Sequence, residues 1–128
     1  MKILIDTCSF LWFIENSPKL SPLALNLIED GNNEVLLSIV SVWEIAIKSS
    51  IGKLSIPHPF DKFIETQLKI NNIELLNISL EEVYFVANLP FHHKDPFDRL
   101  IISQAIVGML PIVSADLVFD SYPVNRLW

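Results

Sequence analysis

The chain has 128 residues, 51% of them hydrophobic and 19% charged, a balance that suits one compact soluble domain over residues 1–128. Fifteen Asp and Glu residues outnumber nine Lys and Arg residues and give a formal charge of -6. This charge argues against a passive binder that grips nucleic-acid phosphates with a basic face. An acidic protein that handles phosphates needs a cation between its own negative charges and those of the phosphate.

The cysteine content and the apolar segments predict a cytoplasmic protein. The single cysteine, Cys8, cannot form an internal disulfide or a multi-cysteine zinc site, which fits a reducing cytosol. The apolar N-terminus is interrupted by Asp6 and lacks a small-residue cleavage site, so we do not expect secretion. The longest uncharged stretch, residues 100–115, has 16 residues and falls short of the ~20 that a membrane span needs.

Alternating apolar and amphipathic segments predict the secondary structure. Apolar runs predict four strands, at residues 2–6, 35–40, 74–78 and 111–114. Periodicity and capping signals predict helices at residues 9–14, 23–30, 42–50, 60–70, 80–89 and 96–107. Because strands alternate with helices along the chain, we expect an α/β sandwich around a mainly parallel sheet.

Four acidic residues fall just beyond predicted strands. Asp6 ends the first strand, Glu44 and Asp98 each lie one turn into a helix, and Asp116 follows the last strand. Ligands of open parallel sheets bind outside the carboxyl ends of the strands, so we expect these side chains to converge. Converging carboxylates repel one another unless protons or a bound cation neutralise them, and all-oxygen ligands suit Mg²⁺ or Mn²⁺.

Two of these acids also have a structural interpretation at the start of a helix. Glu44 stands three residues after Ser41, which we expect to begin its helix, and the pair would form a capping box. Asp98 lies in a first helical turn, where the helix dipole favours acids.

Capping could likewise explain acids next to turns. Asp6 and Asp116 could cap the segments that follow them, and we interpret Asp95 as the N-cap before Pro96. We expect Asp120 to be a solvated loop residue.

Basic residues near the acids leave further alternatives. His92 and His93 could touch a substrate or a metal, but we favour a mobile surface pair. Lys48 follows Glu44 by four residues, and we favour an ion pair between them over a phosphate contact. For Arg99, a phosphate contact and a structural ion pair remain equally open.

Several well-known catalytic and nucleotide-binding motifs are missing. The three glycines are isolated, so the chain has neither the dinucleotide-binding G-x-G-x-x-G nor a P-loop. It also lacks the G-x-S-x-G elbow of serine hydrolases. The four acids therefore remain the strongest candidates for chemistry.

Specific sequence blocks surround these acids. Trp-Glu-Ile-Ala-Ile-Lys occupies residues 43–48, and Asp-Pro-Phe-Asp-Arg occupies residues 95–99. Further matching segments run nearly end to end, at residues 3–7, 11–12, 52–54, 89–90, 104–105 and 114–116, with Phe119 and Tyr122. Together they resemble the PIN-domain ribonucleases of the VapC toxin type, from bacterial toxin–antitoxin pairs.

The resemblance implies a PIN-like three-layer α/β/α sandwich with a mainly parallel sheet of four or five strands. The acidic quartet of the family falls on Asp6, Glu44, Asp98 and Asp116, with none replaced, which argues against an inactive copy. The hydroxyl two residues before the last acid is commonly Thr in the family and is Ser114 here.

The resemblance also implies dependence on Mg²⁺ or Mn²⁺, endonucleolytic cleavage of RNA, a homodimer and neutralisation by a cognate antitoxin. We predict that Asp6, Glu44 and Asp98 hold one divalent ion and that Asp116 joins it or helps a second. The ion would activate a water molecule, whose in-line attack leaves a 5′ phosphate and a 3′ hydroxyl. Predicted supporting or substrate-binding residues are Thr7, Arg99 and Ser114.

Two alternatives belong to other functional classes. A haloacid-dehalogenase-like phosphatase would use Asp6 as a covalent nucleophile, but it expects a second Asp where Cys8 stands. A partner-binding module without catalysis would retain only the fold. Chelator-sensitive cutting of labelled RNA favours the nuclease, whereas no cutting with any metal favours the binding module.

Overall fold

A parallel sheet forms the centre of the computed structural model, which describes residues 1–128. Its strands follow the order β3-β2-β1-β4-β5, and every neighbouring pair is parallel. They are β1 (Lys2–Ile5), β2 (Glu34–Ser38), β3 (Ile73–Leu76), β4 (Ile112–Val113) and β5 (Arg126–Leu127). The expected parallel α/β architecture is confirmed, with the larger of the two expected strand numbers.

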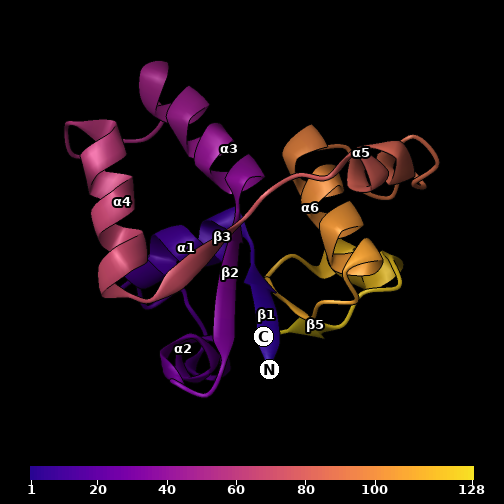
Figure 1. Cartoon of the computed structure of the whole chain (residues 1–128), viewed down its shortest axis with the longest axis horizontal. Helices are drawn as coiled ribbons and strands as arrows, with labels where there is room; N and C mark the ends of the chain where they lie inside the picture. Colours follow the sequence, from indigo (N-terminus) through magenta and orange to yellow (C-terminus); the bar gives the residue numbers. More distant parts are fainter.

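Helices cover both faces of this sheet (Figure 1). They are α1 (Thr7–Ile14), α2 (Pro22–Glu29), α3 (Ile39–Ser50), α4 (Phe60–Ile70), α5 (Leu80–Val86), α6 (Pro96–Val107) and the short 3-10 helix η1 (Leu117–Ser121). Figure 1 shows α1, α2 and α4 on one side, and α5 and α6 on the other. None of the helices combines the length and the hydropathy that crossing a bilayer requires.

The alternation of side chains along β1 divides the interior into two cores. Ile3 and Ile5 are fully buried among residues of α1, α2 and α4, whereas Leu4 is fully buried among residues of α6 and η1. Successive strand residues point to opposite faces, and a sheet covered on both faces needs apolar residues at each of them. This requirement explains why β1 is a continuous apolar run.

Local capping signals place most helix starts correctly. Ser21 caps α2, Asp95 caps α6, and Ser79 forms the expected capping box with Glu82 at the start of α5. The bounds of α4 match the predicted residues 60–70. The apolar pattern does not locate β5, because two residues are too few to show a strand pattern, whereas the resemblance allows for a fifth strand.

The start of α3 differs from the prediction. Strand β2 ends at Ser38, whose Oγ accepts a hydrogen bond from the Val40 amide at 3.1 Å and caps the helix. Ser41 is fully buried inside α3, and Glu44 lies beyond the first turn. The expected capping box between Ser41 and Glu44 is therefore wrong, and a helix-starting role does not account for Glu44.

The chain order creates a crevice at the carboxyl ends of the central strands. From β1 the chain builds outward to β2 and β3, and it then returns through α5 and α6 to β4 on the other side of β1. Between β1 and β4 the direction of winding changes, and in open parallel sheets ligands bind at such a switch point.

Candidate active site

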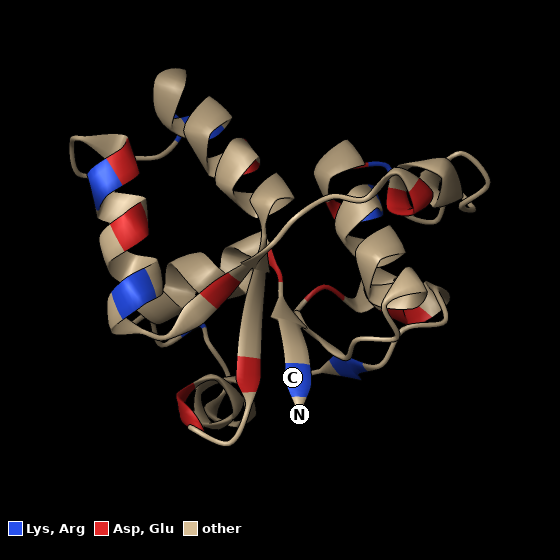
Figure 2. Cartoon of the chain, in the orientation of Figure 1, with Lys and Arg blue, Asp and Glu red and all other residues tan.

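A pocket of about 380 Å³ opens at this switch point. All four predicted acids line it, and they come from segments far apart in the sequence: Asp6, Glu44, Asp98 and Asp116. Figure 2 shows the acidic residues of the chain in red on the ribbon. Lys48 is the only basic residue that lines the pocket.

Backbone amides fix two of the acids at the ends of β1 and β4. Asp6 caps α1, and its Oδ1 accepts a hydrogen bond from the Ser9 amide at 2.8 Å. Asp116 caps η1 through Oδ1, which accepts from the Val118 amide at 3.0 Å. The buried Ser114 hydroxyl accepts from the Asp116 amide at 3.1 Å. Both capping alternatives are confirmed, and capping still directs each carboxylate into the pocket.

Glu44 is held from two sides on α3. Thr7 Oγ1 donates to Glu44 Oε1 at 2.7 Å, and it also lies 2.9 Å from Ser41 Oγ. The ammonium of Lys48 donates to Glu44 Oε2 at 2.5 Å, which confirms the favoured ion pair. Ser41, expected to start the helix, instead lies beneath Thr7 in a buried polar cluster with this carboxylate.

The fourth acid shares a histidine with Asp116. Asp98 lies in the first turn of α6, and its Oδ2 is 3.1 Å from His93 Nε2. The same nitrogen lies 2.8 Å from Asp116 Oδ2. The side chain of His93 is only 13% exposed, so the expectation of a mobile surface residue is wrong for it. His92 is exposed, and its ring packs edge-on against Tyr122.

Burial and crowding oppose negative charge in this pocket. Burial raises the pKa of Asp6, against the effect of hydrogen bonds with Ser114 and Ser9. Burial and then the charge of Asp95 raise the pKa of Asp98 to about 7, against the effect of His93. A bound cation would offset the repulsion between carboxylates that share a pocket and would favour their ionised form. Carboxylate oxygens are ligands that suit Mg²⁺ or Mn²⁺.

The thiol next to these acids stays protonated. Burial, together with the charges of Asp6 and Glu44, raises the pKa of Cys8 to about 11. Only the thiolate is a nucleophile or a metal ligand. The acids, and not Cys8, therefore supply the reactive character of the pocket.

Arg99 has neither of the roles expected for it. Its buried guanidinium donates to the backbone carbonyls of Pro90 at 2.9 Å, Leu89 at 3.0 Å and His93 at 3.2 Å. It also lies 3.9 Å from the centroid of the Phe91 ring. The guanidinium therefore forms no ion pair and is not free to bind a phosphate. Its N–H groups are used by loop carbonyls, and these hydrogen bonds anchor residues 89–93 to α6.

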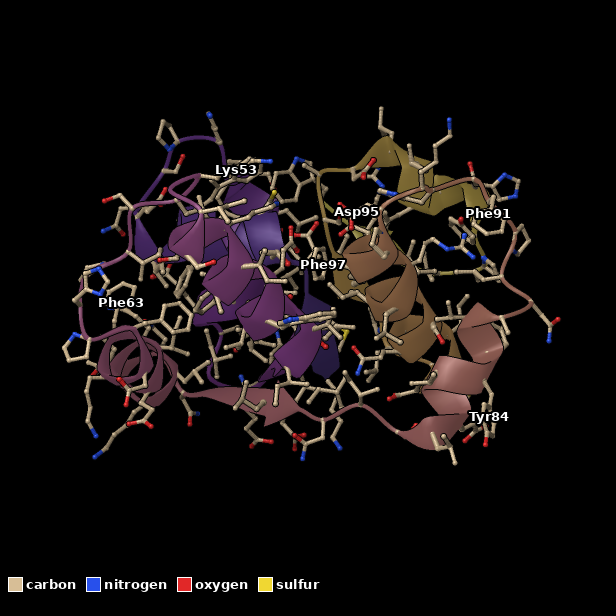
Figure 3. The ribbon with its side chains drawn as sticks, turned by 90° about the horizontal axis from the view of Figure 1, so that it is seen from above. Lys53, Phe63, Tyr84, Phe91, Asp95 and Phe97 are labelled. Carbon is tan, nitrogen blue, oxygen red and sulfur yellow. The ribbon has the colours of Figure 1, made fainter.

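Aromatic side chains connect the two helices beside the pocket. Trp43 of α3 and Phe97 of α6 meet edge to face, with ring centroids 5.0 Å apart. Figure 3 shows Asp95 and Phe97 at the start of α6, beside α3. This contact joins the helices that carry Glu44 and Asp98.

Asp120 is not a free loop residue. It lies in η1, and the Arg126 guanidinium donates to it through Nε at 2.9 Å, which lowers the pKa of Asp120. The pair lies on the surface, and Asp120 is not among the residues that line the pocket.

Comparison with known proteins identifies the family. The PIN-domain model matches residues 3–125, and the chain belongs to the PIN-domain family. A relative from Mycobacterium tuberculosis strain H37Rv, "Ribonuclease VapC16", is 36% identical over 56 residues. That match covers 41% of this chain and 40% of the relative's length.

Solved structures share the whole fold at low sequence identity. VapBC2 from Rickettsia felis, bound to a promoter DNA fragment, aligns over 99% of this chain and 98% of its own, with a TM-score of 0.70 and 18% identity. FitAcB from Neisseria gonorrhoeae aligns over 100% and 97%, with a TM-score of 0.66 and 16% identity. The toxin–antitoxin protein VapBC-5 from M. tuberculosis aligns over 98% of both chains, with a TM-score of 0.61 and 16% identity.

Replacing Arg99 with Lys tests its structural role. Lys keeps the charge but cannot direct donors at several carbonyls at once, so we expect the free energy of unfolding to fall by about 2–3 kcal/mol. Denaturant unfolding measures this loss. Arg126→Lys is the matched control and should cost less, because its partner Asp120 is exposed and Arg126 donates to only one backbone carbonyl, that of Ser114. Equal losses in the two variants would contradict the assignment.

Replacing Asp98 with Asn should stabilise the metal-free protein. The raised pKa of about 7 means that ionised Asp98 destabilises the fold, fully above pH 7 and less as pH falls toward its ordinary value of 3.8. We expect a gain of about 1–2 kcal/mol at pH 8 in the presence of chelator, which shrinks by pH 5. Urea unfolding at both pH values measures this gain in the free energy of unfolding. A larger gain at pH 5 than at pH 8 would contradict the expected direction of the pH dependence.

Proposed function

We propose that this chain is a metal-dependent endoribonuclease that acts as the toxin of a toxin–antitoxin pair. The convergence of four carboxylates in one pocket of a PIN fold carries the proposal. The name of the relative Ribonuclease VapC16 supports RNA as the substrate. The toxin–antitoxin assemblies among the structural neighbours support a protein antitoxin as the partner.

In this proposal Asp6, Glu44 and Asp98 hold Mg²⁺ or Mn²⁺, and Asp116 lies beside them. When bound, the ion lowers the pKa of a water molecule and polarises the scissile phosphate. Thr7 orients Glu44 through its hydrogen bond, and Ser114 orients the backbone before Asp116. Both act as supporting residues and need not touch RNA.

The reaction is hydrolysis of a phosphodiester bond. The water oxygen bonds to phosphorus, the bond from phosphorus to the 3′ oxygen breaks, and the products are a 5′ phosphate and a 3′ hydroxyl. Lys48 keeps its proton, because its hydrogen bond to Glu44 raises its pKa, and it supplies positive charge at the pocket edge. No side chain has to act as a nucleophile.

The assembly and location belong to the same proposal. Exposed apolar side chains on α3 and α5 offer a surface for a homodimer, among them Ile39, Trp43, Leu80 and Tyr84. We place the protein in the cytoplasm, where RNA is available and a lone cysteine stays reduced.

Replacing Asp6 with Asn tests the metal and the chemistry together. Asn keeps the shape of the side chain and an oxygen for the Ser9 amide, so the fold should survive. Loss of the charge should lower cutting of a labelled RNA in Mn²⁺ or Mg²⁺ by at least about 100-fold. Asp61→Asn is the control, because Asp61 is exposed on α4, away from the pocket.

Chelator separates this proposal from its alternatives. Cutting by the unsubstituted chain should stop in EDTA and return with Mg²⁺ or Mn²⁺. Cutting that persists in EDTA, or in purified Asp6→Asn protein, would contradict the metal mechanism. Failure to cut any RNA with any metal would favour a partner-binding module.

A further inference from the structure

One nitrogen occupies the space between two carboxylates of the pocket. His93 Nε2 lies 2.8 Å from Asp116 Oδ2 and 3.1 Å from Asp98 Oδ2. Ligand atoms of these three residues lie within 4.8 Å of one another, a spacing that a metal ion could bridge. The position of the imidazole proton decides whether His93 is a ligand or a donor there.

The other ring nitrogen fixes that proton. The backbone amide of Asp95 donates to His93 Nδ1 at 3.2 Å, so Nδ1 presents a lone pair. A neutral imidazole that accepts at Nδ1 carries its hydrogen on Nε2. The Nε2–H therefore donates to Asp116 Oδ2, with Asp98 Oδ2 3.1 Å from the same nitrogen, and no lone pair remains on Nε2 for a metal.

Several contacts hold the ring in this place. The His93 amide donates to the Tyr122 hydroxyl at 2.8 Å, and its carbonyl accepts from Arg99 at 3.2 Å. The ring packs edge-on against the buried Phe119, with centroids 5.7 Å apart. These contacts come from η1, α6 and the residue after η1, so His93 cannot leave without disturbing the surrounding structure.

The two carboxylates differ in what they leave available. Both oxygens of Asp116 accept hydrogen bonds, Oδ1 from Val118 and Oδ2 from His93. Neither carboxylate oxygen of Asp98 accepts a hydrogen bond from the chain, although its Oδ2 lies 3.1 Å from His93 Nε2. Asp98 can therefore serve an ion while the adjacent His93 N–H holds Asp116.

We propose that the His93 Nε2–H stands where a second cation would bridge Asp98 and Asp116, so that the pocket takes a single divalent ion. His93 is then a positioning residue, which holds Asp116 beside the ion without being a ligand itself. This inference rests on the proposed metal-dependent function, because it concerns the number of ions in the same pocket.

Counting bound Mn²⁺ tests the inference without relying on activity. Isothermal titration of the metal-free chain with Mn²⁺ should give one ion per chain. His93→Gln keeps an N–H donor at similar reach and should still give one. His93→Ala lacks a donor and the shorter His93→Asn keeps its amide N–H out of reach, so each takes the donor away from this position and should give two ions, since Asp98 and Asp116 then face each other unbridged.

His92→Ala is the matched control, because its ring is exposed, packs against Tyr122 and makes no hydrogen bond to Asp98 or Asp116. It should bind one ion. Thermal unfolding of each variant confirms that it is folded, and having two donor-removing variants guards against the failure of either one to fold.

The possible failures point to different errors. Two ions in the unsubstituted chain, or one ion in folded His93→Ala and His93→Asn, would overturn the inference while leaving the nuclease intact. Loss of the first ion in His93→Gln would show that His93 is a ligand and would also overturn it. No Mn²⁺ binding by the unsubstituted chain, with no RNA cutting, would overturn the proposed function itself.

Discussion

The structure depends on keeping several carboxylates together at the carboxyl ends of β1 and β4, where burial and mutual repulsion oppose their charge. Asp6 and Glu44 are each only 6% exposed, and burial is the largest cause of the raised pKa of both Asp6 and Asp98. Such a cluster persists only where hydrogen bonds satisfy its oxygens. Backbone amides at Asp6 and Asp116 and the side chains of Thr7, Lys48 and His93 provide them.

Fold and site consequently share residues. Asp6 begins α1 and Asp116 begins η1, so the side chains that end the strands also start the next elements. A substitution there acts on local structure and on the pocket together, whereas Glu44 and Asp98 cap nothing. For Asp6 and Asp116, we therefore expect the effects of a substitution on stability and on chemistry to be harder to separate than for Glu44 and Asp98.

The loop before α6 shows how distant contacts convert a surface segment into part of the site. Tyr122 donates its hydroxyl hydrogen to the Pro90 carbonyl at 2.6 Å, and Arg99 donates to the same carbonyl at 2.9 Å. These bonds hold the backbone of the loop so that the His93 ring lies next to Asp98 and Asp116. Without them, a His-His pair in a loop would have no reason to be ordered.

The sequence by itself determined the features that short-range patterns encode. Strand and helix alternation, the capping box at Ser79, the cap at Asp95 and the placement of four acids after strands all depend on neighbours within a few residues. The tertiary structure alone decided the start of α3, because residues 35–40 are apolar except for Ser38, and the partner of Ser38 is Gln104, 66 residues away. It also decided the roles of His93 and Arg99, because their partners become neighbours only when the chain folds, and no local pattern records a contact across that distance.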